Sequence, residues 1–261
     1  MISSVEGRRQ LPDTHAHLDA ESLFGDLEAV IARAAEAGIG PILAVGENLE
    51  SSRTAIQIAH RYHSVYAAVG LHPHQASRFD EEAAALEMLL GEEKVVAVGE
   101  IGLDFTRESM ERAVQQRAFE TQLEWARHRG LPVSIHSRGA ETAIVSALQP
   151  SDRAVLHCYG GDGETAKHAL AKGSYISFAG NLTFPRAEEL RSVAAQVPAD
   201  RLLLESDAPV LAPQPRRGRR NEPAYVRMTA DVLADVRGMT PEDLAARVSA
   251  NAASVFGWAL S

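Results

Sequence analysis

Short apolar runs alternate with longer segments of helical period along this chain. The apolar runs predict eight β-strands, the first ending near residues 11–15 and the others at 41–46, 65–70, 94–99, 132–136, 153–157, 174–178 and 201–205. Between the strands, apolar residues recur every three or four positions, as on one face of an amphipathic helix. This spacing predicts helices at 27–37, 51–62, 81–90, 110–129, 140–148, 164–171 and 187–196. Further helices are predicted at 223–236 and 241–248, with 251–257 as a closing helical segment.

The order of these elements predicts an α/β fold made of repeated strand–helix units. Gly130 follows the longest predicted helix, and Pro223 and Pro241 open two later ones, as is common at helix ends and starts. No linker, low-complexity tract or repeat interrupts the chain, so we expect residues 1–261 to form a single domain. A (β/α)8 TIM barrel fits this order, and active sites of that fold lie at the C-terminal ends of the strands.

Polar residues that suit metal binding stand where the predicted strands end. They are His15 and His17 after the first strand, His72 and His74 after the third, Glu100 after the fourth, His136 at the fifth, His157 at the sixth and Asp207 after the eighth. In a barrel these positions share one mouth. Imidazoles and carboxylates gathered there form a cage for divalent cations. The pattern therefore predicts a metal-dependent hydrolase.

The proposed ligands differ in what each could do. Alternate residues of an extended segment point the same way, so His15 and His17 can bind one ion together. Glu100 has two carboxylate oxygens and could bridge two ions about 3.5–4 Å apart. Asp207 could bind metal and also orient or deprotonate the attacking water, which makes it a candidate catalytic residue with Glu100. The alternative is that these are ordinary polar residues of turns and loops.

Two histidines flank Pro73 in a short extended turn. If protonated, His72 or His74 could donate to a phosphate oxygen, and if neutral either could bind metal. We expect His72 to contact the phosphate as a catalytic residue and His74 to assist in substrate binding. The simpler interpretation is that both are loop histidines bonded to nearby backbone.

The overall charge is acidic, with one local exception. The formal net charge is −9, which argues against a protein that coats nucleic acid nonspecifically. The run at 216–220 concentrates arginines after the last strand, and guanidinium groups bind phosphate oxygens in pairs. Such a run is otherwise a solvated loop. The expected substrate contacts are Arg138, Arg217, Arg219 and Arg220.

The cysteine content and the absence of long apolar stretches bear on the cellular compartment. A single cysteine, Cys158, excludes an internal disulfide and fits a reducing environment. The N-terminal residues lack a secretory pattern, and no apolar stretch is long enough to span a bilayer. We expect a cytoplasmic protein that does not bind membranes, with a monomer as the default state.

The motifs, read in order, resemble the TatD family of metal-dependent deoxyribonucleases. The matching segments are Asp13-Thr-His15-Ala-His17-Leu-Asp19, Gly70-Leu-His72-Pro-His74, Gly99-Glu100-Ile-Gly-Leu-Asp104-Phe, His136-Ser-Arg138, His157-Cys-Tyr-Gly, Glu205-Ser-Asp207-Ala-Pro and Arg217-Gly-Arg219-Arg220-Asn221-Glu222-Pro223. A departure is Ser206, where the family often has threonine. Seven motifs in the family's order make the resemblance specific.

The resemblance implies a phosphodiesterase that cleaves DNA with two divalent ions, usually Mg or Mn. It implies that His15 and His17 hold the first ion with Asp207, that His136 and His157 hold the second, and that Glu100 bridges both. It also places His72 beside the scissile phosphate. The four imidazoles would equally suit Zn, so the choice among Mg, Mn and Zn stays open.

We therefore predict an exonuclease that acts on single-stranded DNA ends, because one basic patch at a concave mouth suits end trimming. DNA repair, nucleotide turnover and cell-death DNA degradation are possible roles. One alternative is a hydrolase of a small ester, lactone or amide on the same barrel. In related hydrolase barrels a carbamylated lysine often bridges the metals. The only lysine of the fourth strand, Lys94, lies at its wrong end, which favours a phosphodiesterase over lactonases or phosphotriesterases. A second alternative is a noncatalytic metal-containing binding subunit.

Overall fold

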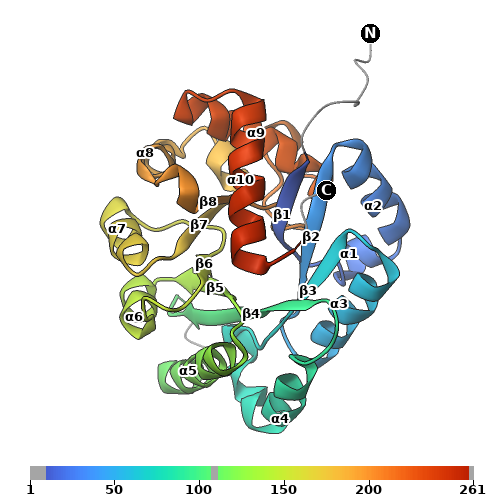
Figure 1. The fold of residues 1–261 in the computed structure, drawn as a ribbon, viewed down its shortest axis with the longest axis vertical. Coiled ribbons are helices and arrows are strands. Elements are labelled where there is room, and N and C mark those ends of the chain that lie inside the picture. The colour runs from blue at the N-terminus through green and yellow to red at the C-terminus, as the bar shows by residue number, and fades with distance from the viewer. Residues whose placement is uncertain (1–9, 107–110, 259–261) are drawn as a thin grey trace.

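The computed structural model describes residues 10–106 and 111–258. Within them, eight parallel strands pair in chain order and curl into a barrel (Figure 1). The strands are β1 (Leu11–Ala16), β2 (Ile39–Val45), β3 (Val65–Val69), β4 (Val95–Asp104), β5 (Val133–Arg138), β6 (Ala154–Leu156), β7 (Tyr175–Phe178) and β8 (Leu202–Leu204). The predicted (β/α)8 TIM barrel is confirmed.

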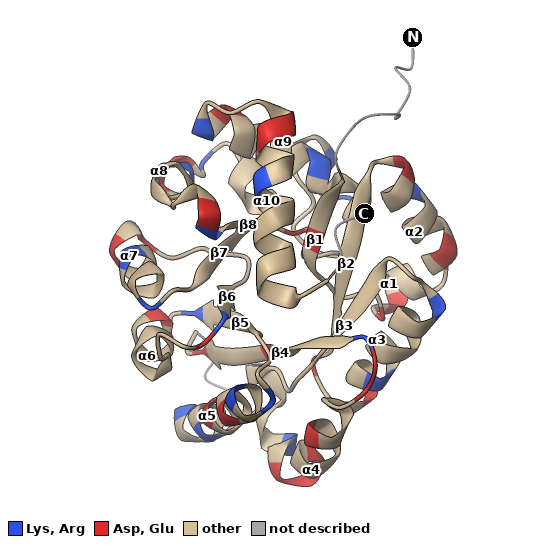
Figure 2. Ribbon diagram, viewed as in Figure 1, with Lys and Arg blue, Asp and Glu red and all other residues tan. Residues whose placement is uncertain are grey.

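Helices connect the strands and surround them on the outside (Figure 1). They are α1 (Glu21–Phe24), α2 (Leu27–Glu36), α3 (Leu49–Arg61), α4 (Phe79–Leu89), α5 (Arg112–Arg129), α6 (Glu141–Ala147), α7 (Gly163–Ala171), α8 (Glu188–Gln196), α9 (Val226–Arg237) and α10 (Pro241–Phe256). Parallel strands require such crossover helices, which bury the outer face of the sheet. Charged residues lie mainly on the outer helices and loops (Figure 2).

The barrel closes where β1 meets the segment after β8. Ala16 and Ala208 form a parallel bridge, and the His17 amide donates to the Ala208 carbonyl at 2.8 Å. The Asp207 amide donates to the His15 carbonyl at 3.0 Å. Closure of the barrel therefore brings residues that follow the first and the last strand together at one side of the mouth.

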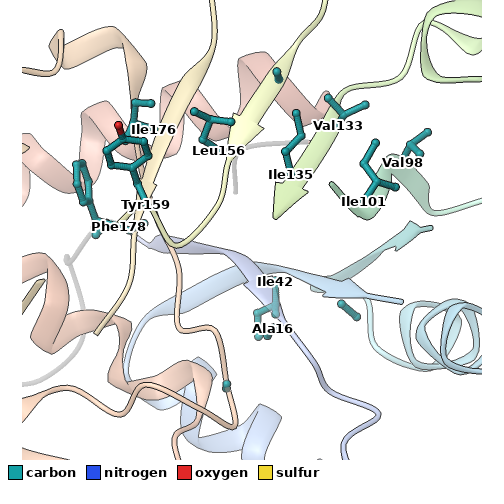
Figure 3. Packing of buried hydrophobic residues seen from close by; sticks show 14 of the residues in the cluster. Ala16, Ile42, Val98, Ile101, Val133, Ile135, Leu156, Tyr159, Ile176 and Phe178 are labelled. Atoms are coloured by element: carbon teal, nitrogen blue, oxygen red, sulfur yellow. The ribbon is translucent and has the colours of Figure 1, made fainter. Parts of the chain in front are cut away.

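Apolar side chains fill the space between the strands and the helix ring. Ile101, Ile135, Leu156, Ile176 and Phe178 belong to one cluster, and each is nearly or fully buried (Figure 3). These residues come from neighbouring strands and pack against the helices, which gives each strand–helix unit a shared core. The strands that carry the site are thus fixed by continuous packing.

A second apolar cluster lies inside the barrel and is covered by the last helix. Leu43 and Leu203 pack there with Phe256, the last residue of α10, and with Trp258, which follows the helix. Trp258 also contacts Tyr66, at the start of β3, with 5.5 Å between ring centroids. In Figure 1, α10 lies across the ring of strands. The helix therefore covers the end where the strands begin and leaves the opposite end for polar residues.

Several element boundaries differ from the prediction. The fourth strand continues to Asp104, so Glu100 lies within β4 rather than after a strand ending at 99. The pairing of β4 with β5 is irregular between Val98 and Ile101. Gly102 has a φ of 145°, and a Cβ there would lie 2.0 Å from the His136 carbonyl oxygen. Glycine thus permits the close approach that carries β4 beyond the predicted end.

The helices also differ from the prediction in places. Helix α10 is continuous, whereas two segments were expected, and the short α1 was missed. Residue 110, the expected start of the fourth crossover helix, lies outside the described residues; α5 starts at Arg112. No helix in the described part of the chain is long and apolar enough to cross a membrane.

Candidate metal centre

The predicted ligands meet at the C-terminal ends of the strands. His15 lies in β1 and His17 directly follows it, Glu100 lies in β4 and His136 in β5, and His157 and Asp207 follow β6 and β8. His15, Glu100, His157 and Asp207 are buried, and His136 and His17 are largely so. Residues separated by up to 192 positions are thus brought into one polar cluster by the closed barrel.

Glu100 is the centre of this cluster. Its side chain is 2% exposed, and ring nitrogens of five histidines lie within 3.5 Å of its two carboxylate oxygens. The nitrogen–oxygen distances are 3.4 Å for His15, 3.5 Å for His17, 3.3 Å for His72, 3.0 Å for His136 and 2.9 Å for His157. A single carboxylate therefore faces imidazoles from four different strand ends.

The chemistry of this donor set fits divalent cations. Two groups of donor atoms share Glu100, one with His15 and His17 and the other with His136 and His157, and within each group all atoms lie within 4.8 Å of one another. The Nε2 atoms of His15 and His17 are 3.3 Å apart, so without a cation only one of them can carry a proton that bonds the other. Nitrogen and carboxylate donors of this kind suit Zn or Mn.

Two histidines of the cluster each have one ring nitrogen without a hydrogen-bond partner. Among the described residues, His17 Nδ1 and His136 Nε2 are buried without a hydrogen-bond partner. Buried polar atoms are nearly always bonded in native proteins, because leaving one unpaired costs about 1–3 kcal/mol. The ring nitrogens that face Glu100 are the other two, Nε2 of His17 and Nδ1 of His136.

Surrounding side chains fix the orientation of the imidazoles. Ser134 Oγ lies 3.0 Å from His15 Nδ1, and Glu205 Oε1 lies 3.2 Å from His157 Nδ1. Glu205 also accepts a hydrogen bond from the Cys158 amide at 2.6 Å. Bonding one ring nitrogen leaves the other aimed at the centre, as is usual around metal-binding histidines. Glu205 was expected in a supporting role, whereas no local signal pointed to Ser134.

The cluster also shifts the pKa values of its members. Burial raises the pKa of Glu100, but the facing charges of His72 and His157 outweigh burial and hold it well below its usual range. Burial likewise opposes the charged form of Asp207, yet the hydrogen bond from His17 and the nearby imidazoles lower its pKa. Both carboxylates are therefore ionised at neutral pH, as metal binding requires.

The two histidines after β3 face different carboxylates. His72 is 4% exposed, its Nε2 faces Glu100, and its Nδ1 accepts a hydrogen bond from the His74 amide at 3.1 Å. His74 Nε2 lies 2.7 Å from Asp104 Oδ2. Glu47, which follows β2, forms a further group of donor atoms with His72 and Glu100. The sequence reasoning missed Glu47, although the rule that polar residues follow strands would have found it.

The arginines predicted to bind substrate occupy different surroundings. Arg138 is exposed at the end of β5, and Arg217 and Arg219 are exposed after β8; none of the three has an ion pair within the described residues. Arg220 instead contacts Asp26 through two nitrogens at 2.6 and 3.0 Å. The arginine segment is thereby attached to the N-terminal end of α2.

Known proteins resemble this chain over most of its length. The family model described as "TatD related DNase" matches residues 12–257. A protein of Cronobacter sakazakii named "3'-5' ssDNA/RNA exonuclease TatD" is 42% identical over 254 residues, which cover 94% of this chain and 97% of that protein. A Bacillus subtilis protein named "Uncharacterized metal-dependent hydrolase YabD" is 38% identical over 249 residues, covering 94% of this chain and 98% of the relative.

The fold shows the same relationship. The crystal structure of YjjV, a TatD homologue from Escherichia coli, superimposes with a TM-score of 0.91 at 32% sequence identity. The superposition covers 95% of this chain and 98% of YjjV. The motifs that resembled this family thus coincide with a match over almost the whole length. On this basis the chain belongs to the family of TatD-related DNases and is a metal-dependent hydrolase.

Proposed function

We propose that this protein is a divalent-metal-dependent exonuclease that removes nucleotides from the ends of single-stranded DNA. The observation that carries the proposal is the single buried Glu100 carboxylate facing five imidazoles at the barrel mouth. The name of the Cronobacter sakazakii relative supports both the substrate and a 3′-to-5′ direction of digestion.

The proposed ligand set draws on these groups of donor atoms. His15 and His17 would hold the first ion together with Asp207, whose Oδ1 lies 3.6 Å from the His17 ring. His136 and His157 would hold the second ion, and Glu100, which shares a group of donor atoms with each pair, would bind both ions. Two bound Mg, Mn or Zn ions would polarise the scissile phosphate and lower the pKa of water.

The protein's own side chains orient the reactants. Asp207 remains ionised because its pKa is lowered, so it can orient the attacking water by accepting a hydrogen bond from it. His72 accepts the His74 amide hydrogen bond at Nδ1, so its N–H lies at Nε2. That N–H can donate to a phosphate oxygen. His74, whose Nε2 lies 2.7 Å from Asp104 Oδ2, assists in substrate binding beside it.

The basic residues at the mouth bind the remaining phosphates. Arg138, Arg217 and Arg219 are exposed without an ion pair among the described residues, which leaves their guanidinium groups available to the strand. Arg220 contributes to substrate binding while it is bonded to Asp26, and so acts partly by positioning the loop. We also propose that residues 1–261 are one domain acting as a monomer in the cytoplasm, in DNA repair. The single cysteine supports a reducing compartment.

A cleavage assay with metal-stripped protein tests this proposal. Single-stranded DNA labelled at either end is incubated with Mg, Mn or Zn added singly, beside the variants His15→Ala/His17→Ala and Glu100→Gln. We expect metal-dependent shortening from the 3′ end that both variants lose. The exposed Glu120→Gln on α5 serves as the matched control for Glu100→Gln and keeps full activity.

The same assay separates the alternatives. A folded, metal-loaded protein that leaves all DNA intact but hydrolyses p-nitrophenyl esters would overturn the nuclease in favour of a small-ester hydrolase. Absence of turnover on both classes of substrate, with metal bound, would indicate a noncatalytic binding subunit.

A further inference from the structure

A pocket lies beside the metal centre, between the segments that follow β6, β7 and β8. It has a volume of about 800 Å³, within the range of about 300–1,000 Å³ found for small-molecule sites. Gly160 and Gly161 line it from the β6 side, Phe184 and Arg186 from the β7 side and Arg217 from the β8 side. Because His157 and Asp207 follow β6 and β8, the pocket opens on the end of the barrel that carries the site.

The pocket presents a flat platform. The Cζ atom of Arg217 lies 4.5 Å from the centroid of the Phe184 ring, so the guanidinium group stacks on the phenyl ring. Phe184 is half-buried, and Arg217 is exposed. Phenyl and guanidinium planes are the surfaces on which proteins stack unpaired nucleobases. Pro185 and Leu190 add apolar lining beside this pair.

A tight turn lines the pocket on the β6 side. The Tyr159 hydroxyl donates to the Asp162 carbonyl at 2.6 Å, and a Cβ at Gly161 would lie only 2.7 Å from that hydroxyl. The Asp162 carboxylate is turned away to accept a bond from the Thr165 amide at the start of α7. The Asp162 carboxylate is thus already bonded within the protein.

A cation is available for the phosphate of a bound nucleotide. Arg186 lines the pocket, is exposed and has no ion pair within the described residues. Arg216, by contrast, lies over the Tyr225 ring with its Cζ atom 5.3 Å from the centroid. A flat platform with a free arginine beside it matches a base joined to its phosphate.

We propose that this pocket, the Phe184 pocket, holds one unpaired base of the substrate strand, stacked on the Phe184–Arg217 platform, while Arg186 binds the adjacent phosphate. This inference rests on the proposed function and adds to it a binding site for a nucleotide away from the scissile bond. A base inside the pocket cannot be paired with a complementary strand. The pocket therefore selects single strands over duplex ends.

The binding test uses oligonucleotides with one 2-aminopurine, placed at successive positions from the 3′ end, and protein kept in EDTA so that no metal-dependent cleavage competes. We expect fluorescence quenching at one position, lost in Phe184→Leu and retained in the control Met88→Leu, whose side chain is exposed on α4. Thermal melting establishes that Phe184→Leu is folded, and Phe184→Tyr should restore the quenching.

A kinetic test uses substrates with one abasic site at the same position. Phe184→Ala should raise KM for the intact strand about 5- to 150-fold, as expected for the loss of one stacked base, and change kcat less than twofold. On the abasic strand the variant and the wild type should have equal KM. Arg186→Gln should weaken the salt dependence of binding, whereas Arg61→Gln, at the C-terminal end of α3, should not.

Two results would overturn the inference. One is quenching that Phe184→Leu leaves unchanged or that occurs at no position. The other is an abasic site that raises KM equally in the wild type and in Phe184→Ala. In both cases a wild type that still degrades DNA keeps the proposed function intact. Loss of the proposed function is distinguishable, because it would be a wild type that cleaves no DNA.

Discussion

Glu205 Oε1 lies 3.2 Å from Nδ1 of His157, and this contact directs the other ring nitrogen of His157 toward Glu100. Glu205 is fully buried and has no other role in the proposed chemistry. A carboxylate behind a metal-binding histidine fixes its tautomer and increases its basicity. The proposed metal centre therefore depends on a residue outside the proposed ligand set.

Replacing this support should weaken metal binding without removing a ligand. For Glu205→Gln we expect the affinity for Mn²⁺ to fall about 10- to 100-fold, the usual range for loss of such support. Isothermal titration of metal-free protein measures it, with Glu120→Gln as the exposed control. An unchanged affinity would mean that the His157 orientation is set elsewhere.

The Arg220–Asp26 contact predicts how the arginine segment works. Asp26 bonds Arg220, and the hydrogen bond with Arg220 lowers the pKa of the Asp26 carboxyl to about 2. If the pair holds the segment in place, Arg220→Gln and Asp26→Asn should reduce DNA cleavage to the same extent. The double variant should then lose no more than either single variant.

A direct contact between Arg220 and DNA predicts a different result for this pair. If Arg220 acts only through direct contact with DNA, Asp26→Asn should leave cleavage unchanged or increase it, because it frees the cation. KM measurements on single-stranded DNA distinguish the two results.

The pKa of His17 predicts the pH dependence of metal-free protein. Burial lowers the pKa of this imidazole, but the hydrogen bond to Asp207 and the charge of Glu100 outweigh burial and raise it from 6.5 to about 9. A raised folded-state pKa gives stability that is fully present below pH 6.5 and is lost as the pH rises through 9. Denaturant unfolding should therefore show the wild type losing stability in that window relative to His17→Gln.

Metal binding offers a second measurement of the protonation of His17. Since His17 must lose its proton to act as a ligand, adding Mn²⁺ at pH 7.5 should release protons from the wild type. Titrations in buffers of different ionisation enthalpy measure this release. Binding heats that do not depend on the buffer would contradict a protonated His17.

The close approach of β4 and β5 predicts an effect on stability. Gly102→Ala would place a methyl group 2.0 Å from the His136 carbonyl oxygen and should lower the free energy of unfolding by about 3 kcal/mol. The matched control is Gly163→Ala in α7, where a Cβ meets no atom within 4 Å. This control should be neutral or slightly stabilising. Equal stability of the two variants by urea unfolding would contradict the strained contact.

The strand order and the positions of the predicted ligands could be read from the sequence because both depend on local patterns. His136 and His157 end apolar runs, and in a closed barrel every such position reaches the same mouth. The extension of β4 to Asp104 could not be predicted, since it depends on how β5 packs against Gly102.

Contacts between distant segments could also not be predicted from the sequence. Nothing near Arg220 indicates that Asp26, 194 positions away, accepts its hydrogen bonds. The position of Ser134 behind His15 likewise depends on the placement of β5 beside the other strands. Glu47 differs from these cases: it follows an apolar run and could have been predicted by the rule that identified the other residues at the mouth.

The most direct test of the central claim is to count ions and activity together. Metal-free protein is titrated with Mn²⁺ while bound metal per chain and the rate of 3′-end cleavage of single-stranded DNA are measured on the same samples. We predict that activity requires two ions per chain and that Glu100→Gln, which removes the bridging charge, loses both the second ion and the cleavage. Full cleavage by Glu100→Gln, or by wild type in excess EDTA, would contradict the account.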